Sequence, residues 1–369
     1  MYVKNDYNNC LTNLACSIRK HFGLPYHHKT LDKIDRLLED NPRNVILILF
    51  DGMGSRILDR TLDQDSFFVQ NKIDDITSVF PATTTAATTS IRTGLNPVEH
   101  GWLGWNTYIH EIDNVITLFL NIEKGTMEIN DDYVRLKNDI LVTSTIAGEI
   151  NSKTQAMGCE LFPFGNDKYE NLDDMLSRIL EMSKEPGKKF IYAYDPEPDT
   201  TMHQYGPDSP EARGLIFERN VKIMDLCDEL EDALVIVVAD HGHIKVDNLF
   251  IRDYPDLYEL MDRNTSIDQR AVSFKIKEGY QEEFRRRFNK ELGMYFKLYP
   301  AQEIIDSKLF GDGLENGNFR YALGDFIAIA EDSNKTIVSD GDQVLYSQHA
   351  GYTDDEVYVP LIAKRLIKK

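Results

Sequence analysis

Runs of consecutive apolar residues mark three segments as buried strands: residues 45–50, 190–194 and 234–239. Each run is rich in β-branched side chains and lacks polar–apolar alternation, which is typical of parallel strands covered on both faces. Helical patterns separate the runs, one at residues 171–185 and another that opens at Ser209-Pro210 with Ser209 as N-cap. This alternation predicts an α/β fold, a three-layer α/β/α arrangement around a mostly parallel central sheet.

The pattern changes after Ile244. Residues 245–347 carry a more charged mixture, in which residues 281–293 predict an exposed helix and residues 271–277 and 325–331 predict strands. We therefore expect a small α+β insertion (cap) domain at residues 245–347. The core domain would then consist of residues 1–244 and 348–369.

Composition narrows the class of partner. The 369 residues are 42% hydrophobic and 28% charged, as in an ordinary globular protein, and 41 basic against 61 acidic residues give a formal net charge of −20. This balance argues against a nucleic-acid polymer as partner, because phosphate backbones require Lys and Arg. A small anionic substrate stays compatible with it, because bound metals reverse the field locally.

Neither a signal peptide nor a membrane-spanning stretch is expected from the sequence. The four cysteines lack CxxC spacing, which disfavours a disulfide framework or a structural zinc cluster. The expectation is a cytoplasmic protein without a membrane partner.

Metal-binding side chains follow the predicted strands. They are Asp51, Asp199, His203, Asp240, His241 and, near the end of the chain, His349. The carboxyl ends of parallel strands meet at one edge of a sheet, so we expect the first five of these side chains to converge there. Three Asp and three His suffice for two metal sites with open positions. Carboxylate and imidazole ligands suit zinc, and also manganese or iron.

Each candidate also has a simpler reading. Asp51-Gly52 is a common turn dipeptide, and Asp240 fits a helix N-cap. His349 stands alone and depends on the other ligands needing a partner. His243 is the weaker candidate and is expected beside the site rather than in it.

A threonine-rich segment, FPATTTAATTS at residues 80–90, predicts a helix from near Pro81 to Thr93-Gly94. Its threonines fit surface positions of a mediocre helix. They also fit a nucleophile at the helix N-terminus, where free N–H groups favour a phosphate. Coordination to a divalent metal would activate a threonine hydroxyl. The aromatic residues Trp102, Trp105 and Tyr108 that follow fit either core packing or stacking on a flat ligand.

These motifs together resemble the alkaline phosphatase superfamily, and within it the type I phosphodiesterase/nucleotide pyrophosphatase family. The matching motifs are LFDGMGS, FPATT with RTGLNPVEHG, PDTTMHQYGP, DHG at residues 240–242 and HAG at residues 349–351. Five motifs in the family order make the resemblance specific over residues 44–244 and around His349. Residues 245–347 match nothing that we recognise.

The resemblance implies a complete catalytic site. One metal would be held by Asp199, His203 and His349, and the other by Asp51, Asp240 and His241, with Thr84 as bridging ligand and nucleophile. The implied cofactors are two divalent ions, zinc by preference, with manganese or iron as alternatives. The implied reaction is hydrolysis of a small phosphoester, with a nucleotide as one candidate, through a phospho-threonine intermediate.

One departure from the family pattern affects substrate binding. Eukaryotic members carry an asparagine that contacts the phosphoryl oxygen, and Ala87 stands at that position here. Asn106 is the substitute candidate. A phosphomonoesterase or phosphomutase of the same superfamily, and a non-catalytic metal-binding relative, remain the alternative functions.

Overall fold

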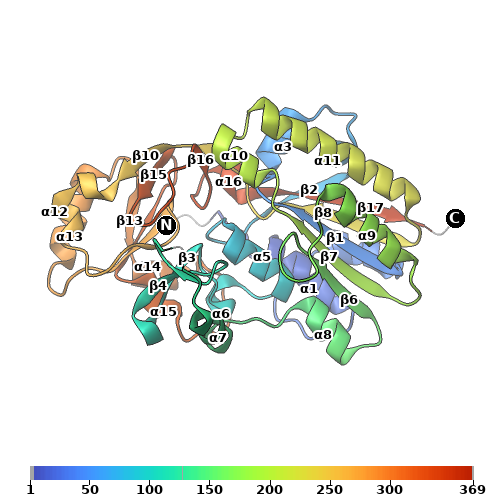
Figure 1. Cartoon of the computed structure of the whole chain (residues 1–369), viewed down its shortest axis with the longest axis horizontal. Helices are drawn as coiled ribbons and strands as arrows, with labels where there is room; N and C mark the ends of the chain where they lie inside the picture. Colours follow the sequence, from blue (N-terminus) through green and yellow to red (C-terminus); the bar gives the residue numbers. More distant parts are fainter. Residues whose placement is uncertain (1–3, 127, 368–369) are drawn as a thin grey trace.

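The computed structural model describes residues 4–126 and 128–367, so residues 1–3, 127 and 368–369 of the predicted core domain lie outside the described residues. Its central sheet has six strands in the order β2-β17-β8-β1-β7-β6 (Figure 1). These strands are β1 (Asn44–Phe50), β2 (Lys72–Thr77), β6 (Met157–Leu161), β7 (Lys189–Asp195), β8 (Ala233–Val238) and β17 (Tyr358–Leu366). The pairs among β6, β7, β1 and β8 are parallel, whereas β17 runs antiparallel to both of its neighbours. The three predicted apolar runs are confirmed as the adjacent strands β7, β1 and β8.

Helices cover this sheet from two sides (Figure 1). On one side lie α1 (Leu11–His21), α5 (Thr84–Thr93) and α8 (Ile146–Lys153). On the other lie α3 (Ser55–Thr61), α4 (Phe67–Asn71), α9 (Leu172–Lys184) and α11 (Pro210–Glu229). The two predicted helices are confirmed as α9 and α11, and the Ser209 hydroxyl caps α11 by accepting from the N–H of Ala212. The chain is therefore an α/β protein with a central sheet.

A second sheet has seven strands in the order β13-β14-β12-β11-β3-β4-β5. Its strands are β3 (Asn106–Ile109), β4 (Asn114–Thr117), β5 (Ile122–Glu123), β11 (Ser266–Ile267), β12 (Ala271–Phe274), β13 (Lys297–Pro300) and β14 (Phe326–Ile329). The predicted strands at residues 271–277 and 325–331 are confirmed as β12 and β14, and the predicted helix as α13 (Gln281–Glu291). However, β3, β4 and β5 come from the part of the chain assigned to the core domain. The second sheet therefore extends beyond residues 245–347.

Short elements complete the chain. The helices are α2 (Asp32–Glu39), α6 (Pro97–His100), α7 (Asp131–Ile140), α10 (Asp199–Tyr205), α12 (Pro255–Tyr258), α14 (Ala301–Asp306), α15 (Phe319–Leu323) and α16 (Asp354–Val357), with single turns η1 (His110–Ile112) and η2 (Ile251–Asp253). Two small ribbons pair β9 (Ile244–Lys245) with β16 (Ser347–Gln348), antiparallel, and β10 (Asp247–Phe250) with β15 (Lys335–Val338), parallel.

The two sheets are joined by buried contacts. Phe80 packs in one apolar cluster with Ile267 of the second sheet and with Tyr352. A fully buried ion pair joins Arg270 Nε to Glu356 Oε1 at 2.6 Å. Loss of one partner from such a pair is strongly destabilising, because it leaves a buried charge uncompensated. The second sheet is thus fixed against the segment that leads from β16 to β17.

The sequence analysis also expected no membrane-spanning stretch and no disulfide framework. Within residues 4–126 and 128–367, no helix combines the length and apolarity needed to cross a bilayer. Cys10, Cys16, Cys159 and Cys227 are all free thiols.

Candidate metal centre

The first part of the centre lies at the carboxyl ends of β1 and β8. Asp51 follows β1 directly, and Asp240 and His241 follow β8, its parallel neighbour. His241 Nε2 lies 3.2 Å from Asp51 Oδ1 and 3.5 Å from Asp240 Oδ2. All three side chains are buried. We call Asp51, Asp240 and His241 the strand-end group.

The second part is built on α10 and the β9–β16 ribbon. Asp199 and His203 lie one turn apart on α10, with His203 Nε2 at 3.2 Å from Asp199 Oδ2. His243 precedes β9 and His349 follows β16; their Nε2 atoms lie 2.8 Å and 4.0 Å from Asp199 Oδ1. One ligand atom from each of these four side chains falls within 4.8 Å of the others. We call Asp199, His203, His243 and His349 the helix–ribbon group.

The place of His243 differs from the sequence expectation, which put this residue beside the site. Pairing of Ile244 with Gln348 in the ribbon brings His243 close to His349, with ring centroids 5.3 Å apart. His243 also joins Asp199 to Ser347, since its Nδ1 lies 2.9 Å from Ser347 Oγ. Two-residue strands leave no hydrophobic period, so the sequence held no signal for this pairing.

The two groups adjoin at Asp199. Its backbone N–H donates to the carbonyl of Asp51 at 3.0 Å. Ligand atoms of Asp51, Asp199 and His241 fall within 4.8 Å of one another. The rings of His241 and His349 stack with centroids 3.7 Å apart. The predicted ligands of both metals therefore form one continuous cluster.

Backbone carbonyls fix the histidine tautomers. The Nδ1 atoms lie 2.8 Å from Ser347 O for His203, 3.2 Å from Ala82 O for His349 and 3.1 Å from Gly242 O for His241. A carbonyl only accepts, so each Nδ1 carries its proton, and in the neutral ring Nε2 keeps a lone pair. All three Nε2 atoms face the carboxylates. This is how imidazole is presented to a metal.

Charge within the cluster is unbalanced. Burial raises the pKa of Asp51 and Asp240 well above the usual range, and repulsion from neighbouring carboxylates raises both further. Burial acts in the same direction on Asp199, but His203 and His243 outweigh it and hold the pKa of that carboxyl well below its usual range.

The residues present fit divalent cations. Among the described residues, no Lys or Arg forms an ion pair with any of the three carboxylates, and Asp240 Oδ2 is buried without a hydrogen-bond partner. Buried charges of this kind require pairing or metal coordination. Bound cations would supply the missing positive charge.

Thr84 lies against the strand-end group. It is the first residue of α5, which begins there rather than near Pro81 and ends at Thr93 before Gly94, whose φ is 76°. Thr84 Oγ1 lies 3.2 Å from His241 Nε2 and 3.4 Å from Asp51 Oδ1. The first N–H groups of a helix have no intrahelical acceptor, so they are available to an anion beside this hydroxyl.

A cavity of about 590 Å³ opens over the cluster, a suitable size for a small molecule. Thr84, His203 and His349 line it together with Trp105, which is 39% exposed. Trp102 and Tyr108 are buried, so the aromatic residues divide between core packing and the cavity wall.

Asn106 lines the same cavity but is held by its neighbours. Its Nδ2 donates to Asp342 Oδ1 at 3.3 Å, and its Oδ1 accepts from Thr117 Oγ1 at 2.7 Å. Ala87 is fully buried in α5. Neither of these two bonds uses the second N–H of the Asn106 side-chain amide.

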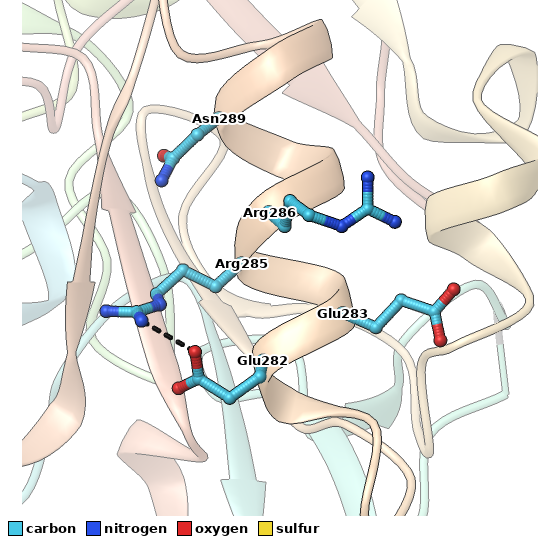
Figure 2. Close-up of a pocket in the computed structure, with 5 residues that line it drawn as sticks. All are labelled: Glu282, Glu283, Arg285, Arg286 and Asn289. Atoms are coloured by element: carbon cyan, nitrogen blue, oxygen red, sulfur yellow. Dashed lines mark hydrogen bonds and ion pairs between the residues drawn. The ribbon is translucent and has the colours of Figure 1, made fainter.

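Another depression, of about 500 Å³, lies on α13, away from this cluster. Figure 2 shows its lining side chains on one helix, with Arg285 and Glu282 directed toward one another at 2.6 Å. None of the candidate ligands reaches it, and its charges largely pair along the helix.

Tyr194 is a site residue that the sequence analysis missed. It lies on β7 next to Asp51, and its hydroxyl donates to Asp51 Oδ2 at 2.6 Å. Tyr194 ends the strand predicted at residues 190–194, which could have marked it as a candidate. The sequence alone, however, does not show that this strand lies beside β1.

Comparisons with known proteins show the family and the fold. The family model described as type I phosphodiesterase/nucleotide pyrophosphatase matches residues 45–353. Murine ectonucleotide pyrophosphatase/phosphodiesterase 5 is similar in structure, with 19% identity, a TM-score of 0.65, and coverage of 88% of this chain and 90% of that chain. An inactive threonine-to-alanine variant of that murine protein, in complex with AMP, gives 18% identity, a TM-score of 0.64 and the same coverage.

A bacterial structure is similar to the same degree. Phosphonoacetate hydrolase from Sinorhizobium meliloti 1021, in complex with phosphonoacetate, has 16% identity and a TM-score of 0.64, with coverage of 88% of this chain and 91% of that chain. At these identities the likeness shows a shared fold. A search of curated protein sequences gave no match.

Proposed function

Because this chain belongs to the type I phosphodiesterase/nucleotide pyrophosphatase family, whose members are phosphoester hydrolases, we propose that it is a two-metal phosphodiesterase with Thr84 as nucleophile. The observation that carries the proposal is the position of Thr84 Oγ1, at the N-terminus of α5 and within 3.4 Å of both Asp51 and His241. A small phosphoester is the substrate class, and the AMP complex of the murine relative supports a nucleotide within it.

Two ions would be held by the two groups. Asp199, His203 and His349 would hold one, with His243 orienting Asp199, and the strand-end group would hold the other together with Thr84. When bound, the ions, zinc in preference to manganese or iron, lower the pKa of the Thr84 hydroxyl and offset charge on the phosphoryl oxygens.

The reaction follows from the positions of the chain's own groups. Thr84 Oγ1 gives up its proton to solvent and attacks phosphorus in line, so that a bond forms to Oγ1 while the bond to the departing alkoxide breaks. The alkoxide takes a proton from solvent and leaves as an alcohol. The N–H groups of the first turn of α5 bind the phosphoryl oxygens. Water then cleaves the phospho-threonine, which regenerates the Thr84 hydroxyl and releases a phosphomonoester.

The alternatives within the superfamily are a phosphomonoesterase and a phosphomutase. A monoester carries an additional negative charge, which an enzyme usually meets with a cation. Arg92 is the arginine nearest to Thr84 in sequence, but it binds both oxygens of Glu160, at 2.8 and 3.0 Å. The side chains that line the cavity include neither Lys nor Arg among the described residues. Both observations favour a diester.

Hydrolysis of bis-p-nitrophenyl phosphate and p-nitrophenyl phosphate by the metal-loaded protein tests the proposal. The expected result is a higher kcat/KM for the diester. A clear preference for the monoester contradicts the diesterase assignment. Turnover of neither substrate by protein with full metal content favours the non-catalytic alternative.

We also propose a domain arrangement and a cellular location. The scaffold is the three-layer α/β/α core, with residues 245–347 as an α+β insertion beside the site. The protein acts in the cytoplasm on a small molecule, without a nucleic-acid polymer or a membrane as partner. Activity in the soluble fraction after cell fractionation is the expected result, and activity confined to membranes contradicts it.

A further inference from the structure

One carboxylate of the second sheet contacts the start of the nucleophile helix. Asp268 follows β11, and its Oδ2 accepts from Thr83 Oγ1 at 2.8 Å. Its Oδ1 accepts from the backbone N–H of Gln269 at 2.8 Å. Asp268 lines the same cavity as Thr84. Residues that the sequence patterns assigned to the insertion therefore touch the residue directly before the nucleophile.

The backbone before Asp268 is strained. Ile267 has a φ of 75°, a conformation that β-branched residues rarely adopt. It is fully buried and pairs with β12 and β3. The lack of a side chain at Gly104 leaves space for the Ile267 backbone, because a Cβ at position 104 would lie 2.4 Å from Ile267 O. Such conformations persist only where the surrounding structure enforces them, and they cluster at functional sites.

The hydrogen bond between Asp268 and Thr83 affects the N-terminus of α5. It is the N-cap residue of α5, yet its hydroxyl forms no capping bond to the helix. A free threonine at this position normally bonds to an N–H of the first turn. Because Asp268 accepts from the Thr83 hydroxyl, those N–H groups stay available beside Thr84.

We propose that Asp268 is a positioning residue for the reaction, which holds the Thr83 hydroxyl away from α5 and thereby fixes Thr84 and keeps the first-turn N–H groups open to phosphoryl oxygens. This inference rests on the proposed function, since it assigns a role within the same site. It also gives the second sheet a part in catalysis besides covering the cavity.

A double-mutant cycle with Asp268→Ala and Thr83→Val tests the pair. Asp268→Ala is expected to lower kcat for bis-p-nitrophenyl phosphate by about tenfold to a hundredfold with little change in KM, because the freed Thr83 hydroxyl then bonds to the first-turn N–H groups. Thr83→Val has no hydroxyl to cap the helix and should lower kcat less, through the lost anchor of Thr84 alone. The double variant should behave like Thr83→Val, because without the hydroxyl the loss of Asp268 has no further effect. Thr83→Ser restores the hydroxyl and should keep kcat within a few-fold of the unmodified protein.

Asp262→Ala, an exposed carboxylate of the same segment, is the matched control and should keep the original kcat. Equal metal content and equal melting temperature across the variants separate positioning from loss of fold. Effects that multiply in the double variant, or an Asp268→Ala enzyme with the original kcat, overturn the inference.

A crystal structure of the metal-loaded Asp268→Ala variant gives a readout independent of turnover. The Thr83 hydroxyl is expected to rotate onto the N–H groups of α5. An unchanged Thr83 rotamer and unchanged Thr84 position overturn the inference, even if the protein hydrolyses no phosphodiester and the proposed function itself fails.

Discussion

The strand-end group and the helix–ribbon group differ in both scaffold and composition. The first stands on two neighbouring parallel strands, contains two carboxylates and one imidazole, and is at most 2% exposed. The second stands on a short helix and a two-stranded ribbon, with one carboxylate and three imidazoles. Asp199, His203 and His349 of this second group line the cavity.

This difference suggests a division of labour. The strand-end group is deeply buried and lies against Thr84, so its position suits activation of the nucleophile. The helix–ribbon group faces the cavity, where the departing group of the substrate would lie. A rigid site for the nucleophile and a more open site for the substrate follow from the two scaffolds.

The largest expected effect is loss of the nucleophile. Thr84→Ala should lower kcat by about a thousandfold or more, because the hydroxyl that accepts the phosphoryl group is gone. Both ions should remain bound, since six Asp and His ligands are retained. Thr89→Ala, which removes a hydroxyl that donates to the Thr85 carbonyl on the same helix, is the control. Turnover by Thr84→Ala at the original rate would disprove the assignment.

Metal removal should affect the two groups in sequence. Increasing concentrations of a chelator are expected to withdraw the ion of the helix–ribbon group first, because that group is open to the cavity. Full removal should abolish hydrolysis and lower the free energy of unfolding by about 3 kcal/mol or more, through lost binding to the native state. Metal content, activity and melting temperature measured on the same samples check the order. Simultaneous loss of both ions would show that the strand-end group and the helix–ribbon group do not differ in how readily they release metal.

In metal-free protein the two groups should respond to mutation with opposite signs. Asp240→Asn removes a buried carboxylate that burial and Asp51 both disfavour, so the free energy of unfolding at neutral pH should rise. His203→Gln removes the charge partner of Asp199 and should lower the free energy of unfolding. Urea unfolding with excess chelator measures both. Changes of the same sign would mean that the groups are electrostatically alike.

The smallest effect is a pH dependence of the metal-free protein. Burial lowers the pKa of His203, but attraction to Asp199 outweighs it and raises the pKa to about 9, from 6.5 in the unfolded chain. The stabilisation is therefore fully present below pH 6.5 and is lost as the pH rises through 9. His203→Gln should remove this slope. A metal-loaded protein should lack it too, and its persistence there would argue against His203 as a ligand.

The sequence carried much of this structure because the central strands are extreme in pattern. The runs around Ile46, Ile191 and Val235 are buried on both faces, and their unbroken apolar character predicts this burial. The position of a side chain directly after such a strand then placed Asp51 and Asp240 at one edge.

Contacts that depend on pairing between distant segments could not be predicted in this way. His243 reaches the cluster through a ribbon of two-residue strands, and Tyr194 through the order of strands in the sheet. Strands β3, β4 and β5 join the second sheet across more than a hundred residues of sequence. Asp268 depends on a positive φ at Ile267, where no glycine signals the conformation.

Anomalous diffraction from crystals of the metal-loaded protein with bound phosphate tests the central claim most directly. The predicted result is two peaks per chain. One peak should lie between Asp199, His203 and His349, and the other between Asp51, Asp240 and His241, with Thr84 Oγ1 in contact with the second. A single peak, or a second peak that leaves Thr84 uncontacted, would contradict the account.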